Sequence, residues 1–203
     1  MTRTHIIWLS FIAAMTIVTG LLAIGDGDSP GGFPATRTGL LSSGLAPDVI
    51  FDIDAPIDSS RWDGIVVHHS ASPAGDAKSL DRLHRGYGYD GLGYHFLIGN
   101  GNGLGDGTVH VGYRWNEQKA GAHTAGRDAA RYNERMIGIC LIGNGDQRPF
   151  TQDQIAELIS LVQRLQKRFD IAADQVYLHR DLAPVSSPGR FFPAATLREQ
   201  LVD

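Results

Sequence analysis

The chain has a single cysteine, Cys140, in 203 residues, so it cannot form an intrachain disulfide. Positive charge is also scarce, because 18 Lys and Arg residues stand against 22 Asp and Glu residues, for a net charge of −4. This balance lacks the basic footprint of nucleic-acid-binding proteins, and we expect no DNA or RNA partner. With 42% hydrophobic and 20% charged residues, the composition is that of a globular protein held together by packing. We expect Cys140, in an apolar run, to be an inert core thiol.

Charged residues are absent between Ile6 and Ile24, and Arg3 and His5 precede this apolar run. The pattern predicts that residues 1–25 are either an export signal peptide or a membrane anchor, and the length of the run leaves both open. Either one implies an exported protein, periplasmic or extracellular, which residues 6–24 would tether to the membrane if they are retained.

Residues 26–60 are rich in Gly, Pro, Ser and Asp, and we interpret them as a flexible linker. Within this stretch, residues 49–53 are more apolar. They are compatible with a short strand packed on the following domain or with an apolar part of the linker, and the sequence does not decide between these.

Residues 61–203 are predicted to form one α/β domain with a central mixed β-sheet flanked by helices. Apolar, β-branched runs predict strands at residues 65–69, 94–98, 136–142 and 176–179. Helices are predicted at residues 79–85 and 196–202 and after Thr151, where Gln154 completes a capping-box pattern. The apolar stripe of that last helix predicts a core-facing side, formed by Ile155, Leu158, Ile159, Val162 and Leu165. The glycine-rich residues 99–107 are predicted to be a hairpin loop.

Histidines carry most of the chemistry that the domain can offer: His68, His69, His84, His95, His110, His123 and His179. Because His68 and His69 are adjacent on a predicted strand, their side chains point to opposite faces and only one of them can enter a given site. By the same alternation, His95 is expected in the core or behind the site, opposite Tyr94. We expect His84 and His110 at the surface.

Four further segments follow the strand histidines in a characteristic order: residues 93–96, 120–124, 133–144 and 179–184. Together they resemble the type-2 N-acetylmuramoyl-L-alanine amidases and the related peptidoglycan recognition proteins, over roughly residues 62–202. The resemblance implies the fold of that family and a peptidoglycan or muropeptide partner. It also implies hydrolysis of the amide that joins N-acetylmuramic acid to the L-alanine of the stem peptide.

The resemblance also implies a zinc site. His68 and His179 match the two histidine ligands, and the position directly before Pro-Gly, here Ser187, matches the third. Three protein ligands and one open position lower the pKa of a zinc-bound water to about 7, which produces the attacking hydroxide. Tyr94 matches the active-site tyrosine, while His123 and Asn144 are predicted to bind substrate.

The third ligand position departs from the pattern of the family's hydrolases. Those enzymes carry a thiolate or carboxylate where this chain has Ser187, and a Lys or Thr where it has Val185. A neutral hydroxyl is a poor zinc ligand, and valine has no donor for an oxyanion. Two functions therefore stay open, a zinc amidase and a recognition module that binds without cleaving. Asp181 is an alternative third ligand, although we expect it to orient backbone instead.

A third hypothesis makes Ser186 or Ser187 a nucleophile with His179 as its base. The chain has no Gly-x-Ser-x-Gly elbow, and Pro188 after Ser187 suits a turn better than a catalytic apex. This hypothesis is therefore the least favoured of the three.

Overall fold

The computed structural model describes residues 49–53 and 55–202. The predicted signal peptide or anchor, and most of the predicted linker, lie outside the described residues. Five strands form one sheet in the order β3-β2-β4-β1-β5. β1 is parallel to β4 and β5, and β2 is parallel to β4 but antiparallel to β3, so the predicted mixed sheet is confirmed. The strands are β1 (Gly64–His69), β2 (Phe96–Ile98), β3 (Val109–Val111), β4 (Met136–Leu141) and β5 (Val176–Leu178).

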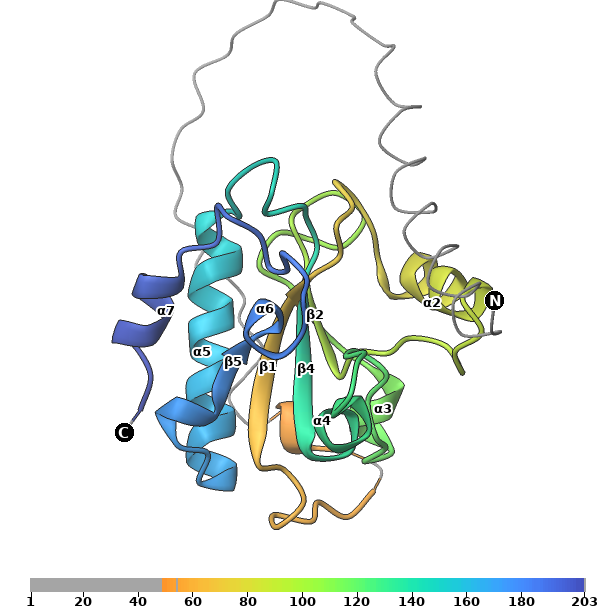
Figure 1. Cartoon of the computed structure of the whole chain (residues 1–203), viewed down its shortest axis with the longest axis vertical. Coiled ribbons are helices and arrows are strands. Elements are labelled where there is room, and N and C mark those ends of the chain that lie inside the picture. The colour runs from red at the N-terminus through yellow and green to blue at the C-terminus, as the bar shows by residue number, and fades with distance from the viewer. Residues whose placement is uncertain (1–48, 54, 203) are drawn as a thin grey trace, which may run out of the picture. The chain divides into compact units, whose positions relative to one another are not determined.

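Helices lie on both sides of this sheet, with α5 and α7 on one side and α2 and α3 on the other (Figure 1). Their bounds are α2 (Ala77–Gly86), α3 (Tyr113–Asn116), α4 (Ala129–Arg135), α5 (Gln152–Phe169), α6 (His179–Leu182) and α7 (Ala194–Glu199). Two 3-10 turns, η1 (Val49–Phe51) and η2 (Ala173–Gln175), complete the order. Across residues 49–53 and 55–202, none of the helices combines the length and apolar character that a membrane span requires.

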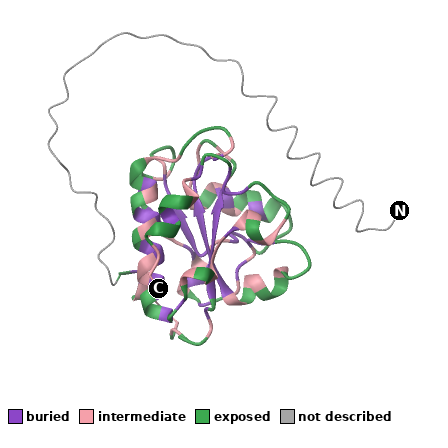
Figure 2. Cartoon of the chain, turned by 60° about the vertical axis from the view of Figure 1, so that its left-hand side comes forward, coloured by how far each residue is buried: buried purple, intermediate pink, exposed green. Residues whose placement is uncertain are grey.

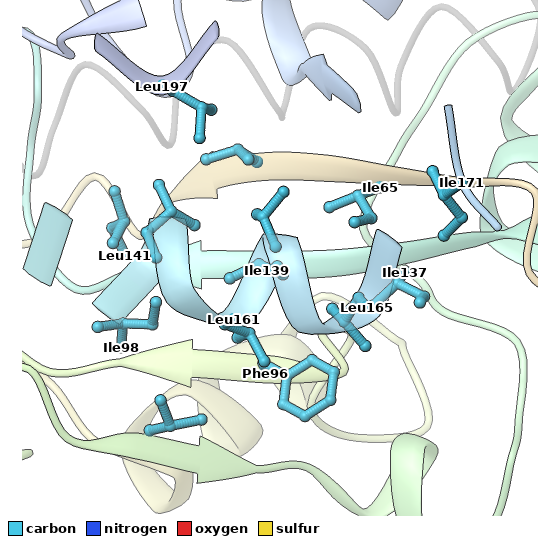
Figure 3. Packing of buried hydrophobic residues seen from close by; sticks show 14 of the residues in the cluster. Ile65, Phe96, Ile98, Ile137, Ile139, Leu141, Leu161, Leu165, Ile171 and Leu197 are labelled. Carbon is cyan, nitrogen blue, oxygen red and sulfur yellow. The ribbon is translucent and has the colours of Figure 1, made fainter. Parts of the chain in front are cut away.

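The two faces of the sheet have different roles. Thr151 and Gln154 cap α5 reciprocally, as predicted. The buried side of α5 packs on alternate residues of the central strands, among them Ile65, Ile139 and Phe96 (Figure 3). Since side chains alternate along a strand, His68 and Cys140 project from the opposite face. His68 therefore lies on the face of the sheet that α5 does not cover.

The predicted linker extends too far toward the C-terminus. Ile50 is completely buried in the main core, and its carbonyl accepts a hydrogen bond from the indole of Trp115. Of the two alternatives for this segment, packing on the domain is the one observed. Residues 49–51 form a 3-10 turn there and not the expected strand. The folded domain therefore includes Val49 and does not begin at residue 61.

The strands of the sheet form the buried centre of the domain, as the purple ribbons in Figure 2 show.

Smaller differences concern the ends of elements. α2 begins at Ala77, two residues before the predicted start, because Asp76 caps it together with Ser79. α7 spans residues 194–199 where 196–202 was predicted. Tyr94 precedes β2, and His179 opens α6 instead of ending β5. The hairpin predicted for residues 99–107 is confirmed, since these residues lie between the antiparallel β2 and β3.

Candidate functional site

Four predicted site residues from distant segments meet on the face of the sheet opposite α5. His68, the fifth residue of β1, is the common neighbour. Its ring centroid lies 4.4 Å from that of His179, 5.0 Å from that of His123 and 5.2 Å from that of Tyr94. The structure thus brings together the two imidazoles and the phenol that the resemblance implies. Their position near the carboxyl end of a parallel strand is where α/β folds commonly bind ligands.

The ring of His123 packs closely against a glycine of the sheet. A Cβ atom at Gly138 would come within 2.4 Å of the His123 ring, so only glycine at this position of β4 leaves room for the imidazole. The loop that carries His123 is fixed by Asn133, whose Oδ1 accepts hydrogen bonds from the backbone of His123 and Thr124. The motif residues around position 133 therefore position the site histidine.

Hydrogen bonds assign the protons of the clustered imidazoles. His123 Nε2 lies 3.1 Å from the Met136 carbonyl, which can only accept, so this nitrogen carries the proton. His123 Nδ1 is then an acceptor, and His68 Nε2, 3.1 Å away, donates to it. His68 Nδ1 consequently keeps its lone pair. His123 acts as a positioning residue that fixes both the tautomer and the orientation of His68.

The pKa values of these histidines are lowered, chiefly by burial. Burial and the neighbouring imidazoles hold the pKa of His68 well below its usual value. Burial likewise lowers the pKa of His123 to about 4 and that of His179 to about 4. The cluster is therefore neutral at pH 7 and offers lone pairs and N–H donors instead of positive charge.

Ser187 lies at the third ligand position, where the sequence places it. Its Oγ accepts a hydrogen bond from the backbone N–H of His69 at 3.1 Å, and its carbonyl accepts one from Arg180 at 2.8 Å. These bonds tie the segment after α6 to the end of β1, beside both predicted histidine ligands. The ring of His69 supports this arrangement, because its Nδ1 accepts from Gly145 and a second hydrogen bond joins it to the backbone of Pro188.

His179 has a nitrogen without a partner. Its Nε2 is buried and makes no hydrogen bond within the described part of the chain. Buried polar atoms in native proteins are nearly always satisfied, and an exception inside a cluster of site residues points to a group that the site receives.

The donor set does not fit zinc. Catalytic zinc sites use three protein ligands drawn from imidazole, thiolate and carboxylate groups. Here only His68 and His179 offer lone pairs, because both ring nitrogens of His123 are engaged. Asp181 accepts from the Leu178 N–H, as expected for a residue that orients backbone. Residues 49–53 and 55–202 contain no group of three His, Cys, Asp or Glu side chains that could hold a metal ion.

Tyr94 contacts the site with its ring, while its hydroxyl hydrogen-bonds the Cys140 thiol. Burial and this contact raise the pKa of Tyr94 well above its usual value, so the phenol stays protonated. Cys140 is completely buried and its thiol pKa is raised by burial, in line with the prediction of an inert core thiol.

The structure pairs neither candidate serine nucleophile with the predicted base, His179. Ser186 Oγ donates to Asp146, and Ser187 Oγ is bonded to the His69 N–H and not to His179. The hypothesis of a serine hydrolase is therefore wrong for this arrangement.

Val185, at the position where the family's hydrolases carry Lys or Thr, is 43% exposed, and its side chain has no polar group to offer a ligand.

The prediction that His84 lies at the surface is also wrong. His84 is buried, its ring lies 5.3 Å from that of Tyr94, and its Nδ1 accepts from the Gly93 N–H at 2.8 Å. Leu80, the other buried residue of α2, is one helical turn away on the same face, and this spacing was the available signal. His110 is half-buried on β3. His95 is fully buried behind the site, as predicted.

Asn144 lies apart from the histidines, in the loop after β4. Its Oδ1 accepts from the Asp146 N–H at 3.0 Å, and it lines a cavity of about 300 Å³ that none of the site histidines lines. Its predicted role in substrate binding stays a prediction.

Known proteins are similar to this chain in sequence and in fold. The chain is 31% identical over 134 residues to the endolysin of Escherichia phage T7, which covers 62% of this chain and 80% of that protein. The solved amidase LysCS from Clostridium intestinale URNW superposes with a TM-score of 0.60 at 28% identity, over 72% of this chain and 88% of that one. A chain from the complex of peptidoglycan recognition proteins LCa and LCx with tracheal cytotoxin superposes with a TM-score of 0.54 at 26% identity. The match covers 70% of this chain and 85% of that one.

A family model described as N-acetylmuramoyl-L-alanine amidase matches residues 58–190, which include every predicted site residue. The family accommodates both hydrolases and recognition proteins, as the similar proteins illustrate. With the fold and the convergence of His68, Tyr94 and His179, this match shows that the chain belongs to the N-acetylmuramoyl-L-alanine amidase family Amidase_2.

Proposed function

We propose that this domain binds the muropeptide units of peptidoglycan without hydrolysing them. The observation that carries the proposal is Ser187, a neutral hydroxyl engaged by the His69 N–H at the position where the family's zinc hydrolases carry a thiolate or carboxylate. The ring nitrogens that the described residues leave without a partner, His68 Nδ1 and His179 Nε2, are suited to hydrogen bonding with a polar ligand.

Three further points support a muropeptide as the ligand. The complex of the recognition proteins LCa and LCx, one chain of which matches this protein at 26% identity, was solved with tracheal cytotoxin bound. The unsatisfied Nε2 of His179 offers a buried polar contact that an amide or hydroxyl group of a ligand would complete. The export signal or anchor predicted in residues 1–25 would place the domain outside the cytoplasm, where peptidoglycan lies.

Hydrolysis of the bond between N-acetylmuramic acid and L-alanine is the competing function. The convergence of His68, His179 and Tyr94 favours it, because these residues match those of the family's zinc hydrolases. The two functions differ in whether the native chain holds zinc, since a zinc hydrolase must retain the ion that activates its water.

Zinc titration of the full-length wild type and of two cysteine variants separates these functions. We expect the wild type to show no zinc binding at micromolar concentrations and Ser187→Cys to bind one equivalent, because a thiolate completes the set with His68 and His179. Ser186→Cys is the matched control and should behave like the wild type, since the hydroxyl it replaces faces Asp146. Stoichiometric zinc in the wild type would overturn the proposal.

A further inference from the structure

The peptide groups that precede Tyr94 are bonded to side chains of two helices. Asp81 of α2 accepts a hydrogen bond from the Leu92 N–H at 2.9 Å, and Arg114 of α3 donates one from its Nε to the Leu92 carbonyl at 2.7 Å. Leu92 is buried, and a buried backbone group that loses its partner costs free energy. These bonds therefore fix the course of the chain toward Tyr94.

Gly93, directly before Tyr94, joins α2 to the loop of His123. Its N–H donates to Nδ1 of His84 at 2.8 Å, and its carbonyl accepts from the Ala122 N–H at 2.9 Å. A Cβ atom at Gly93 would come within 2.3 Å of the Ala122 carbonyl oxygen, so the two segments are in close contact. The bond to His84 thus fixes the backbone from which the Tyr94 side chain projects.

His84 also contacts the Tyr94 ring. Their ring centroids lie 5.3 Å apart, and the Tyr94 centroid in turn lies 5.2 Å from that of His68. The Tyr89 ring packs edge-on against His84, with the centroids 5.9 Å apart. A chain of ring contacts therefore runs from α2 through Tyr94 to His68.

The bond to Gly93 requires an unprotonated Nδ1 on His84, because a backbone N–H can only donate. Burial lowers the pKa of His84, and so does the positive charge of Arg114. The Asp81 carboxylate and a hydrogen bond with the Gly91 backbone act in the opposite direction. The net shift is downward, so the ring is neutral at pH 7 and its acceptor is available.

We infer that His84 is a positioning residue of the candidate site, whose Nδ1 holds the segment before Tyr94 so that the Tyr94 ring packs against His68. Where it concerns ligand affinity, the inference rests on the proposed function, in which His68 Nδ1 bonds to the ligand. It adds a residue of α2 that controls affinity through Tyr94 and His68.

Two substitutions separate the hydrogen bond of His84 from the packing of its ring. In His84→Asn, the Oδ1 atom replaces Nδ1 as the acceptor for Gly93, but the ring is lost. In His84→Phe, a ring remains and the acceptor is lost. If the acceptor positions Tyr94, His84→Asn substitutes for the wild type and His84→Phe is defective. A residue that only fills space would give the reverse order.

Calorimetric titration of the full-length protein with a muropeptide compares these variants. The probe is the disaccharide of N-acetylglucosamine and N-acetylmuramic acid bearing a stem tetrapeptide. We expect His84→Phe to weaken binding roughly tenfold, which corresponds to about 1.4 kcal/mol, and His84→Asn to stay within about threefold of the wild type. Wild-type affinity in His84→Phe, or an equal loss in both variants, would overturn the inference.

His110→Phe is the matched control, because His110 is a half-buried histidine of β3 whose electrostatic neighbour is Asp76. It should bind the muropeptide like the wild type, and a loss equal to that of His84→Phe would count against a specific role of His84. Urea unfolding curves verify that each variant is folded. His84→Leu, which also lacks an acceptor, takes the place of His84→Phe if that variant does not fold.

A second measurement on the same variants needs no ligand. The ring protons of Tyr94 and His68 should give a nuclear Overhauser effect in the wild type and in His84→Asn, and a weaker one or none in His84→Phe. An unchanged effect in a folded His84→Phe variant would overturn the inference, even if the variant is less stable. If the wild type does not bind the muropeptide, the proposed function fails, and this comparison still decides whether His84 positions Tyr94.

Discussion

At the scale of single residues, the buried histidines form a neutral, hydrogen-bonded cluster and not a charged one. His68 and His123 share a hydrogen bond, and His95 accepts from the Gly138 N–H with its Nδ1. A ring nitrogen that accepts a hydrogen bond must be unprotonated, so these bonds require His123 and His95 to be neutral in the folded state. The same bonds that orient the site therefore make the fold sensitive to acid.

We predict that the stability of the domain falls as the pH drops from 7 toward 4. The pKa of His123 is about 4 in the folded protein against an ordinary value of 6.5, so the unfolded chain binds the proton first. Stability is complete above pH 6.5 and is lost through this window, by roughly 2 kcal/mol per such histidine at pH 5. Urea unfolding at pH 7.5, 6 and 5 measures it, and a flat or rising profile would contradict the assignment of neutral imidazoles.

The pairing of site residues could be predicted from the sequence only where a motif marked them. His68, Tyr94, His123 and His179 lie in ordered segments, and the structure brings their side chains together. His84 has no such segment, and its burial follows from the packing of α2. The donor of each hydrogen bond and the unsatisfied Nε2 of His179 depend on three-dimensional contacts that no sequence pattern encodes.

At the scale of elements, Gln154 joins helix α5 to the sheet. It completes the capping box of α5, and its Nε2 donates to the carbonyls of Ile98 and Ile142 at 3.1 and 2.9 Å. We predict that Gln154→Ala lowers the free energy of unfolding by about 2 kcal/mol, because several buried hydrogen bonds are lost. Gln152→Ala, an exposed change in the same helical turn, should cost less than about 0.5 kcal/mol in the same urea titration. Equal effects would contradict this role.

The turn η1 gives a second prediction at this scale. Ile50 is completely buried, so Ile50→Ala should destabilise the domain by about 2–4 kcal/mol through lost burial and a residual cavity. Val49→Ala changes a neighbour that is 47% exposed and should cost less than about 0.5 kcal/mol. Thermal or urea unfolding of both variants measures this difference. An Ile50→Ala variant as stable as the wild type would contradict the assignment of Ile50 to the folded domain and would favour a flexible linker that extends to residue 60.

Long periodic elements could be predicted, and short ones could not. Helix α5 has a capping box and an apolar stripe, and β1 and β4 are runs of apolar residues, so each carries its own signal. β3 and η1 have three residues each, too few for any period to emerge. Their structure comes from tertiary contacts, pairing with β2 for one and the pocket beside Trp115 for the other.

At the scale of the whole molecule, the candidate site lies on the face of the sheet opposite the main hydrophobic core. The face that carries Ile65 and Ile139 is sealed by α5, whereas the face that carries His68 receives loops and turns from four other segments. Substitutions are tolerated more easily on the second face. A loop residue such as Ser187 can differ from the residue that the family's hydrolases have at this position without disturbing the main core. Amidases and recognition proteins share this fold, and the third ligand position is where this chain departs from the pattern of the hydrolases.

The most direct test of a binding, non-hydrolysing domain is the incubation of the full-length protein with purified peptidoglycan and added zinc, followed by mass spectrometry of the soluble fraction. We predict that the protein sediments with the peptidoglycan and that no peptide with a free L-alanine amino terminus appears. Release of such peptides by the wild type, at a rate proportional to protein concentration, would contradict the account.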